Sequence, residues 1–146
     1  MIDISQHTNC ICYKDKRNSV VCEENNSRYV LHNNSGFEIE KIKVDTCLPY
    51  MQNERKCDFL LRAIKSNDKR LYLIELKGKA VLKAVSQLDN SLSILEITGK
   101  SANQVNGRIV PTRVHPPDLR STSYLKLKNR FKALNGDLNQ KNSDTI

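Results

Sequence analysis

Two apolar runs joined by a short polar turn, with a helical pattern after them, constrain the fold most. Residues 57–64 form the first run, residues 66–69 (Ser-Asn-Asp-Lys) are typical of a turn, and residues 71–77 form the second run. Beyond Gly78, residues 80–95 carry apolar side chains at helical spacing. The sequence therefore predicts a central β-hairpin with one amphipathic helix packed on it, which is an α/β arrangement.

Shorter elements are expected on both sides of this centre. They are an N-terminal β-hairpin formed by residues 11–13 and 19–22, strands over residues 28–31, 37–44 and 108–114, a basic helix over residues 123–135, and a polar, disordered tail over residues 137–146. Pro111 has no N–H for a ladder, so the strand over residues 108–114 is expected at an edge or a bulge.

Length and apolar content bound the size of the core. A chain of 146 residues suits one domain, placed here over residues 1–136. With 38% hydrophobic residues and no Trp, the core should depend on Leu, Ile and Val in a thin, two-layer fold. There is no run long enough to span a bilayer and no signal-peptide pattern, so a cytoplasmic location is expected.

The charge balance favours a polyanionic partner. Lys and Arg total 24 against 16 Asp and Glu, a formal net charge of +8, which makes nucleic acid the leading partner class. Residues Arg108 and Arg113 near the last strand, and Lys126 and Arg130 on the basic helix, are the candidate phosphate contacts. The alternative is that the basic side chains of this helix only face solvent and bind no partner.

The cysteines fit reduced thiols better than a disulfide framework. There are five, an odd number, and no C-x-x-C pair. The alternative is a zinc site, although its spacing matches no usual zinc pattern, and its ligands would be His7, Cys10, Cys12 and Cys22.

Asp58, Glu75 and Lys77 are the candidate catalytic group. Glu75 and Lys77 lie two apart on a predicted strand, so their side chains leave the same face. A turn centred between Asn67 and Asp68 would place Asp58 opposite Lys77 and diagonal to Glu75. Charged residues are common on exposed strands, but these two follow an apolar run, where a charge is costly without a partner.

Two carboxylates on neighbouring strands suit Mg²⁺, or Mn²⁺, because such an ion takes few carboxylates and keeps several waters. A metal held this way can activate water and neutralise charge at a phosphodiester. The ammonium group of Lys77 could stabilise the transition state or position the attacking water.

The motif Asp58, then Glu75-Leu76-Lys77, followed by a helix bearing Gln87, resembles the PD-(D/E)xK nuclease superfamily. The resemblance implies a restriction-endonuclease-like mixed central sheet flanked by helices. It also implies a metal bound by Asp58, Glu75 and the Leu76 carbonyl, with Lys77 and Gln87 assisting hydrolysis of DNA.

The sequence departs from this pattern at two points. Cys57 stands where the family has Pro, and no acidic residue is evident on an early helix. The residues that could substitute for that acid are Glu38, Glu40 and Asp45.

Two other function classes stay open. One is a non-cleaving nucleic-acid module or accessory subunit, which would bind in a salt-sensitive way. The other is a protein-interaction or inhibitor module. The sequence does not separate a monomer from a homodimer or a larger complex.

Overall fold

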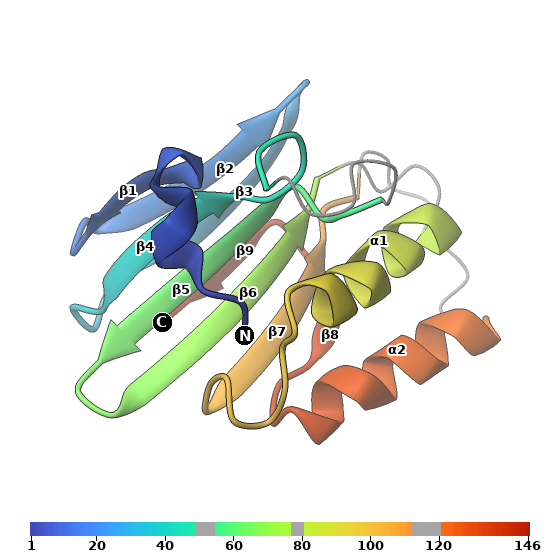
Figure 1. The fold of residues 1–146 in the computed structure, drawn as a ribbon. Coiled ribbons are helices and arrows are strands. Elements are labelled where there is room, and N and C mark those ends of the chain that lie inside the picture. Colours follow the sequence, from blue (N-terminus) through green and yellow to red (C-terminus); the bar gives the residue numbers. More distant parts are fainter. Residues whose placement is uncertain (49–54, 77–80, 112–120) are drawn as a thin grey trace.

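The structure is a computed structural model that describes residues 1–48, 55–76, 81–111 and 121–146. Its elements, labelled in Figure 1, are the 3₁₀ helix η1 (Ile4–Cys10), the strands β1 (Ile11–Asp15), β2 (Ser19–Glu24), β3 (Ser27–His32), β4 (Glu38–Lys43), β5 (Phe59–Lys65), β6 (Asp68–Glu75), β7 (Gln104–Ile109), β8 (Leu138–Gln140) and β9 (Ser143–Thr145), and the helices α1 (Val81–Ile94) and α2 (Thr122–Ala133).

A mixed six-stranded sheet runs in the order β1-β4-β5-β6-β7-β8. The first four strands pair antiparallel, whereas β6, β7 and β8 run parallel to one another. Parallel neighbours need crossover connections, and α1 and α2 lie in the connections from β6 to β7 and from β7 to β8. The α/β class and the central β5–β6 hairpin are confirmed.

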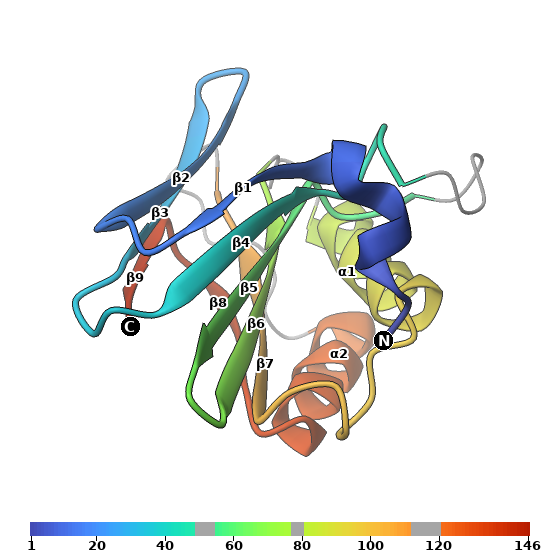
Figure 2. The same ribbon diagram turned by 60° about the vertical axis from the view of Figure 1, so that its left-hand side comes forward.

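The molecule has three layers and not the expected two. The helices cover one face of the large sheet, and a small sheet of order β2-β3-β9 covers the other (Figure 2). Leu60 and Leu73 pack toward the helices, while Leu61 and Ile74 pack toward the small sheet. Covering on both faces explains the continuous apolar runs at residues 59–61 of β5 and 71–74 of β6.

The predicted N-terminal hairpin is wrong in its pairing. β1 joins the large sheet beside β4, and β2 pairs with β3 across a two-residue turn. That turn is Asn25-Asn26, with φ values of 45° and 66°, the left-handed conformation that such tight hairpin turns require.

The prediction of a disordered tail is also wrong. β8 pairs with β7, and β9 pairs with β3, so residues after Gly136 contribute a strand to each sheet. As a result β7 is an interior strand and not an edge, and Pro111 follows its end. Gly136 is required there because a Cβ atom would lie 1.7 Å from the Val105 carbonyl oxygen.

Among the described residues, no helix is both long and apolar enough to cross a bilayer.

Candidate functional site

The site lies where β5 begins and β6 ends, at the upper end of the large sheet in Figure 1. Asp58 directly precedes β5. Its backbone N–H donates to the Ile74 carbonyl at 3.0 Å, and its carboxylate accepts from the Leu76 N–H at 2.8 Å. The side chain of Asp58 therefore takes up a backbone donor at the point where the ladder ends.

The β5–β6 register differs from the predicted one. The turn lies over Ser66-Asn67, since Lys65 faces Asp68 and Phe59 faces Ile74. Each β5 residue therefore faces a β6 residue two positions earlier than expected. A shift of two keeps side chains on the same face of the sheet, so the prediction that Asp58 and Glu75 lie together survives the error.

Asp58 and Glu75 are both buried, with 8% and 2% of their surface exposed. Burial raises the pKa of Asp58, the nearby charge of Glu24 raises it further, and hydrogen bonds from Leu76 and with Glu75 act in the opposite direction. Glu24, Asp58 and Glu75 therefore interact as one group, which we call the carboxyl cluster.

Glu24 has no counterpart among the residues expected from the sequence. It ends β2, and the β2–β3 hairpin brings it to Asp58 from the small sheet. Ser27, which faces Glu24 across the hairpin, donates a hydrogen bond from its hydroxyl to the Leu76 carbonyl. A signal for the hairpin was present in Asn25-Asn26, but no local pattern indicates what its tip contacts.

Leu76 is therefore held through both of its backbone polar groups by side chains. Lys77, the third member of the predicted catalytic group, lies outside the described residues.

Gln87 lies on α1 beside the chain that enters β5. Its side-chain NH₂ donates to the Lys56 carbonyl at 3.4 Å, two residues before Asp58. On the same helix Ser91 accepts from the Cys57 N–H at 2.8 Å. Both side chains anchor the segment that carries Asp58, which is a positioning role.

The substitutes proposed for an early acid are not in the carboxyl cluster. Glu40 is 2.6 Å from Arg62, and Glu38 is 3.6 Å from Lys14. Both lie near the start of β4. The residue of β4 that faces Phe59, next to Asp58, is Lys43 at the other end of the strand. Asp45 donates its N–H to the Cys57 carbonyl at 3.1 Å, so its backbone lies beside the segment that leads to Asp58.

Arg108 is wrong as a phosphate contact. It is 4% exposed and makes ion pairs with Asp137 at 2.8 Å and with Asp144 at 2.7 Å. Tyr29 also donates to Asp144, at 2.6 Å. Arg108 therefore joins β7 to the C-terminal strands instead of facing solvent.

The remaining basic candidates divide between α2 and an undescribed segment. Arg130 pairs with Asp89 of α1 at 2.6 Å, and Lys126 is exposed. Both line a groove of about 460 Å³ between the two helices, with Leu82, Val85 and Leu127 as its apolar part. Arg113 lies outside the described residues.

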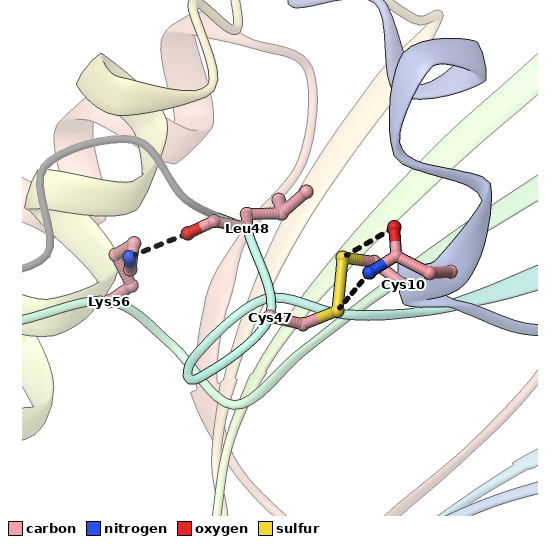
Figure 3. Close-up of a disulfide and its surroundings, with 5 residues drawn as sticks. Cys10, Cys47, Leu48 and Lys56 are labelled. Carbon is pink, nitrogen blue, oxygen red and sulfur yellow. Dashed lines mark hydrogen bonds between the residues drawn. A yellow bond between two sulfur atoms is a disulfide. The ribbon is translucent and has the colours of Figure 1, made fainter.

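The prediction of reduced thiols is wrong for two of the five cysteines. Cys10 and Cys47 form a disulfide that ties the end of η1 to the loop after β4 (Figure 3). In the same loop Leu48 accepts a hydrogen bond from the buried Lys56 ammonium at 3.1 Å (Figure 3). The disulfide also removes the proposed zinc site, since Cys10 is bonded elsewhere and Cys22 is buried in the small sheet.

The donor set fits a hard cation better than zinc. Within the described ranges, no three His, Cys, Asp or Glu side chains are arranged as ligands of one metal ion. Two adjacent carboxylates with an adjoining backbone carbonyl still match Mg²⁺, which is commonly held through one or two carboxylates plus water and substrate phosphate.

No family model, no curated protein and no solved structure matches this chain.

Proposed function

We propose that this chain is a divalent-metal-dependent nuclease that hydrolyses phosphodiester bonds in DNA, with a restriction-endonuclease-like fold of the PD-(D/E)xK type. The observation that carries the proposal is the adjacency of Asp58 and Glu75, buried together where two neighbouring strands meet. Burying two carboxyl groups side by side is unfavourable unless protons or a cation compensate their charge.

In this proposal Asp58 and Glu75 bind Mg²⁺ or Mn²⁺, and the Leu76 carbonyl is a third oxygen ligand. When bound, the ion supplies an activated water and neutralises charge at the phosphate. Asp58 keeps the backbone of Leu76 in place through its bond to the N–H, and Gln87 supports the chain before Asp58. Lys77 would contribute a positive charge to the transition state.

The net charge of +8 supports a nucleic-acid substrate. Lys126 and Arg130, on α2, remain the proposed contacts to the phosphates of the nucleic acid, together with Arg113. A cytoplasmic location remains a prediction, and the Cys10–Cys47 disulfide weighs against it because cytosolic reductants keep most thiols reduced.

Substitution tests the proposal directly. Glu75→Gln removes the charge at nearly constant shape, and Lys77→Ala removes the ammonium group. Each should reduce Mg²⁺-dependent cleavage of plasmid and single-stranded DNA by at least about 100-fold, as expected for loss of a charge that acts in the transition state. Glu38→Gln is the matched control, since Glu38 is partly exposed and pairs with Lys14 away from the site. Unchanged cleavage in both test variants, with both folded, would remove the proposal.

A second candidate is a non-cleaving nucleic-acid module, favoured by the absence of a three-side-chain metal group in the described part of the chain. It predicts salt-sensitive binding that survives Asp58→Asn, and no cleavage with any divalent ion.

A further inference from the structure

The tip of the β2–β3 hairpin lies against the end of β6, although the two segments are far apart in sequence. Asn25 and Asn26 close the turn, so Glu24 and Ser27 are cross-strand neighbours at the tip. Glu24 acts on Asp58, and Ser27 reaches Leu76 across 49 positions of the chain. The small sheet thus supplies side chains to a site built on the large sheet.

Ser27 is placed as a buried donor. It is 4% exposed, and its hydroxyl donates to the Leu76 carbonyl. The backbone carbonyl of Glu75, the last residue of β6, still accepts a hydrogen bond from the Val110 N–H at 2.9 Å. Leu76 lies beyond the end of the strand. Its N–H is bound by the Asp58 carboxylate and its carbonyl by Ser27, so side chains from two other segments set the orientation of this residue.

A carbonyl oxygen has two lone pairs, and Ser27 uses one of them. By restraining the carbonyl group, the same bond also restrains the direction of the second lone pair. We infer that Ser27 is a positioning residue that orients the Leu76 carbonyl as a ligand for a divalent cation, so that hairpin docking is part of the metal site. This inference rests on the proposed function and adds to it a residue from outside the motif.

The test compares three variants of the full chain. Ser27→Ala removes the hydroxyl, Ser27→Thr keeps it on a strand that tolerates a β-branched residue, and Ser101→Ala is the control. Ser101 is also a buried serine, 8% exposed, and accepts from the Thr98 N–H at 2.9 Å away from the site. Thermal melts establish that each variant is folded.

The first measurement uses metal-free protein. Ser27→Ala should shift the ¹³C resonance of the Leu76 carbonyl and speed the exchange of the Leu76 N–H, while Ser27→Thr and Ser101→Ala should resemble the wild type. An unchanged carbonyl resonance in Ser27→Ala would overturn the inference whatever the metal does. A folded Ser27→Thr variant that behaves like Ser27→Ala would also overturn it.

The second measurement is the dissociation constant for Mn²⁺ by calorimetry. Ser27→Ala should weaken binding about 10-fold, the lower end of the range for residues that orient metal ligands. Equal or tighter binding by Ser27→Ala would overturn the inference alone, because the proposed metal site would still exist. Failure of the wild type to bind Mn²⁺ would overturn both the proposed function and the metal role of Ser27.

Discussion

The carboxyl cluster brings the exposed Glu24 against two buried carboxyl groups, Asp58 and Glu75, so the stability of the protein should depend on pH and on cations. Burial and the charge of Glu24 raise the pKa of Asp58 above 3.8. A raised pKa means that the folded state binds a proton more tightly than the unfolded state. The contribution of Asp58 is therefore favourable at low pH and is lost as the pH rises through its folded pKa.

Asp58→Asn should stabilise the metal-free protein at pH 8. The amide oxygen can still accept from the Leu76 N–H, and the repulsion with Glu24 disappears, a gain on the order of 1 kcal/mol for neighbouring like charges in a water-like medium. Urea unfolding with a chelator measures the difference, which should vanish near pH 3. Added Mg²⁺ should stabilise the wild type and not the variant. If the Asp58→Asn variant were less stable than the wild type at pH 8, the interpretation that the Asp58 charge destabilises the metal-free protein would be contradicted.

The pKa of Asp144 is shifted in the opposite direction to that of Asp58. Burial would raise its pKa, but hydrogen bonds from Arg108, Tyr29 and Lys141 together hold the pKa below 3.8. The stabilisation by the Asp144 carboxylate is therefore present above its ordinary pKa and lost as the pH falls through the lower folded pKa.

Asp144→Asn should lower the free energy of unfolding by about 3 kcal/mol at pH 7, because the buried Arg108 loses a charged partner. The deficit should shrink below pH 4. Urea titrations from pH 7 to pH 2 measure it. Asp15→Asn is the control, since Asp15 and Arg17 are 44% and 43% exposed and such a pair contributes little. A constant deficit across this pH range would contradict the assignment.

At the scale of elements, periodicity predicted the segments that are buried on a regular pattern. β4 and α1 were found in this way, whereas β5 and β6 were predicted from apolar runs and α2 as a basic helix, all with ends displaced by a few residues. The adjacency of Asp58 and Glu75 followed from strand parity even though the turn was misplaced. Local patterns carry this information because burial of one face, or of both faces as in β5 and β6, determines which residues of the element itself are apolar.

Pairing and docking were not predictable in the same way. β8 and β9 have three residues each and take their structure from their pairing with β7 and β3. Glu24 joins Asp58 only because the small sheet packs on the large one. Both facts depend on contacts between distant segments, which no window of the sequence contains.

The Cys10–Cys47 disulfide acts on the loop after β4, an element with little other regular structure. It closes a separation of 37 residues. Restricting the unfolded chain by a loop of this size contributes about 4 kcal/mol in the chain-entropy estimate, and less where the native state is strained. Cys10→Ser should therefore lower the free energy of unfolding by about 2–4 kcal/mol.

Urea unfolding in oxidising and reducing buffer measures this contribution. Cys12→Ser is the matched control, because Cys12 is a free, exposed cysteine on the adjoining strand. The urea unfolding midpoint of the wild type in reducing buffer should match that of Cys10→Ser in oxidising buffer. Equal midpoints for the wild type in both buffers would contradict the structural role of the disulfide.

At the scale of the whole molecule, the C-terminal segment connects the two sheets. β8 extends the large sheet and β9 extends the small one, and Asp137 and Asp144 both pair with Arg108 of β7. Leu138 is buried against the helices and Ile146 in the core between the sheets. The segment expected to be disordered is thus the one that joins the layers.

Deleting residues 137–146 should therefore unfold the protein and not merely shorten it. Loss of two buried apolar side chains costs about 1.5–3 kcal/mol each, and leaving Arg108 buried without a partner costs about 3–5 kcal/mol more. The total of about 6 kcal/mol or more is comparable with the whole stability of a small domain. Circular dichroism of the truncated chain should show loss of the cooperative transition, while Thr145→Ala, an exposed position in β9, should keep it. A truncated chain with an unchanged unfolding midpoint would mean that the two sheets hold together through their apolar faces alone, and that the C-terminal strands follow the fold without determining it.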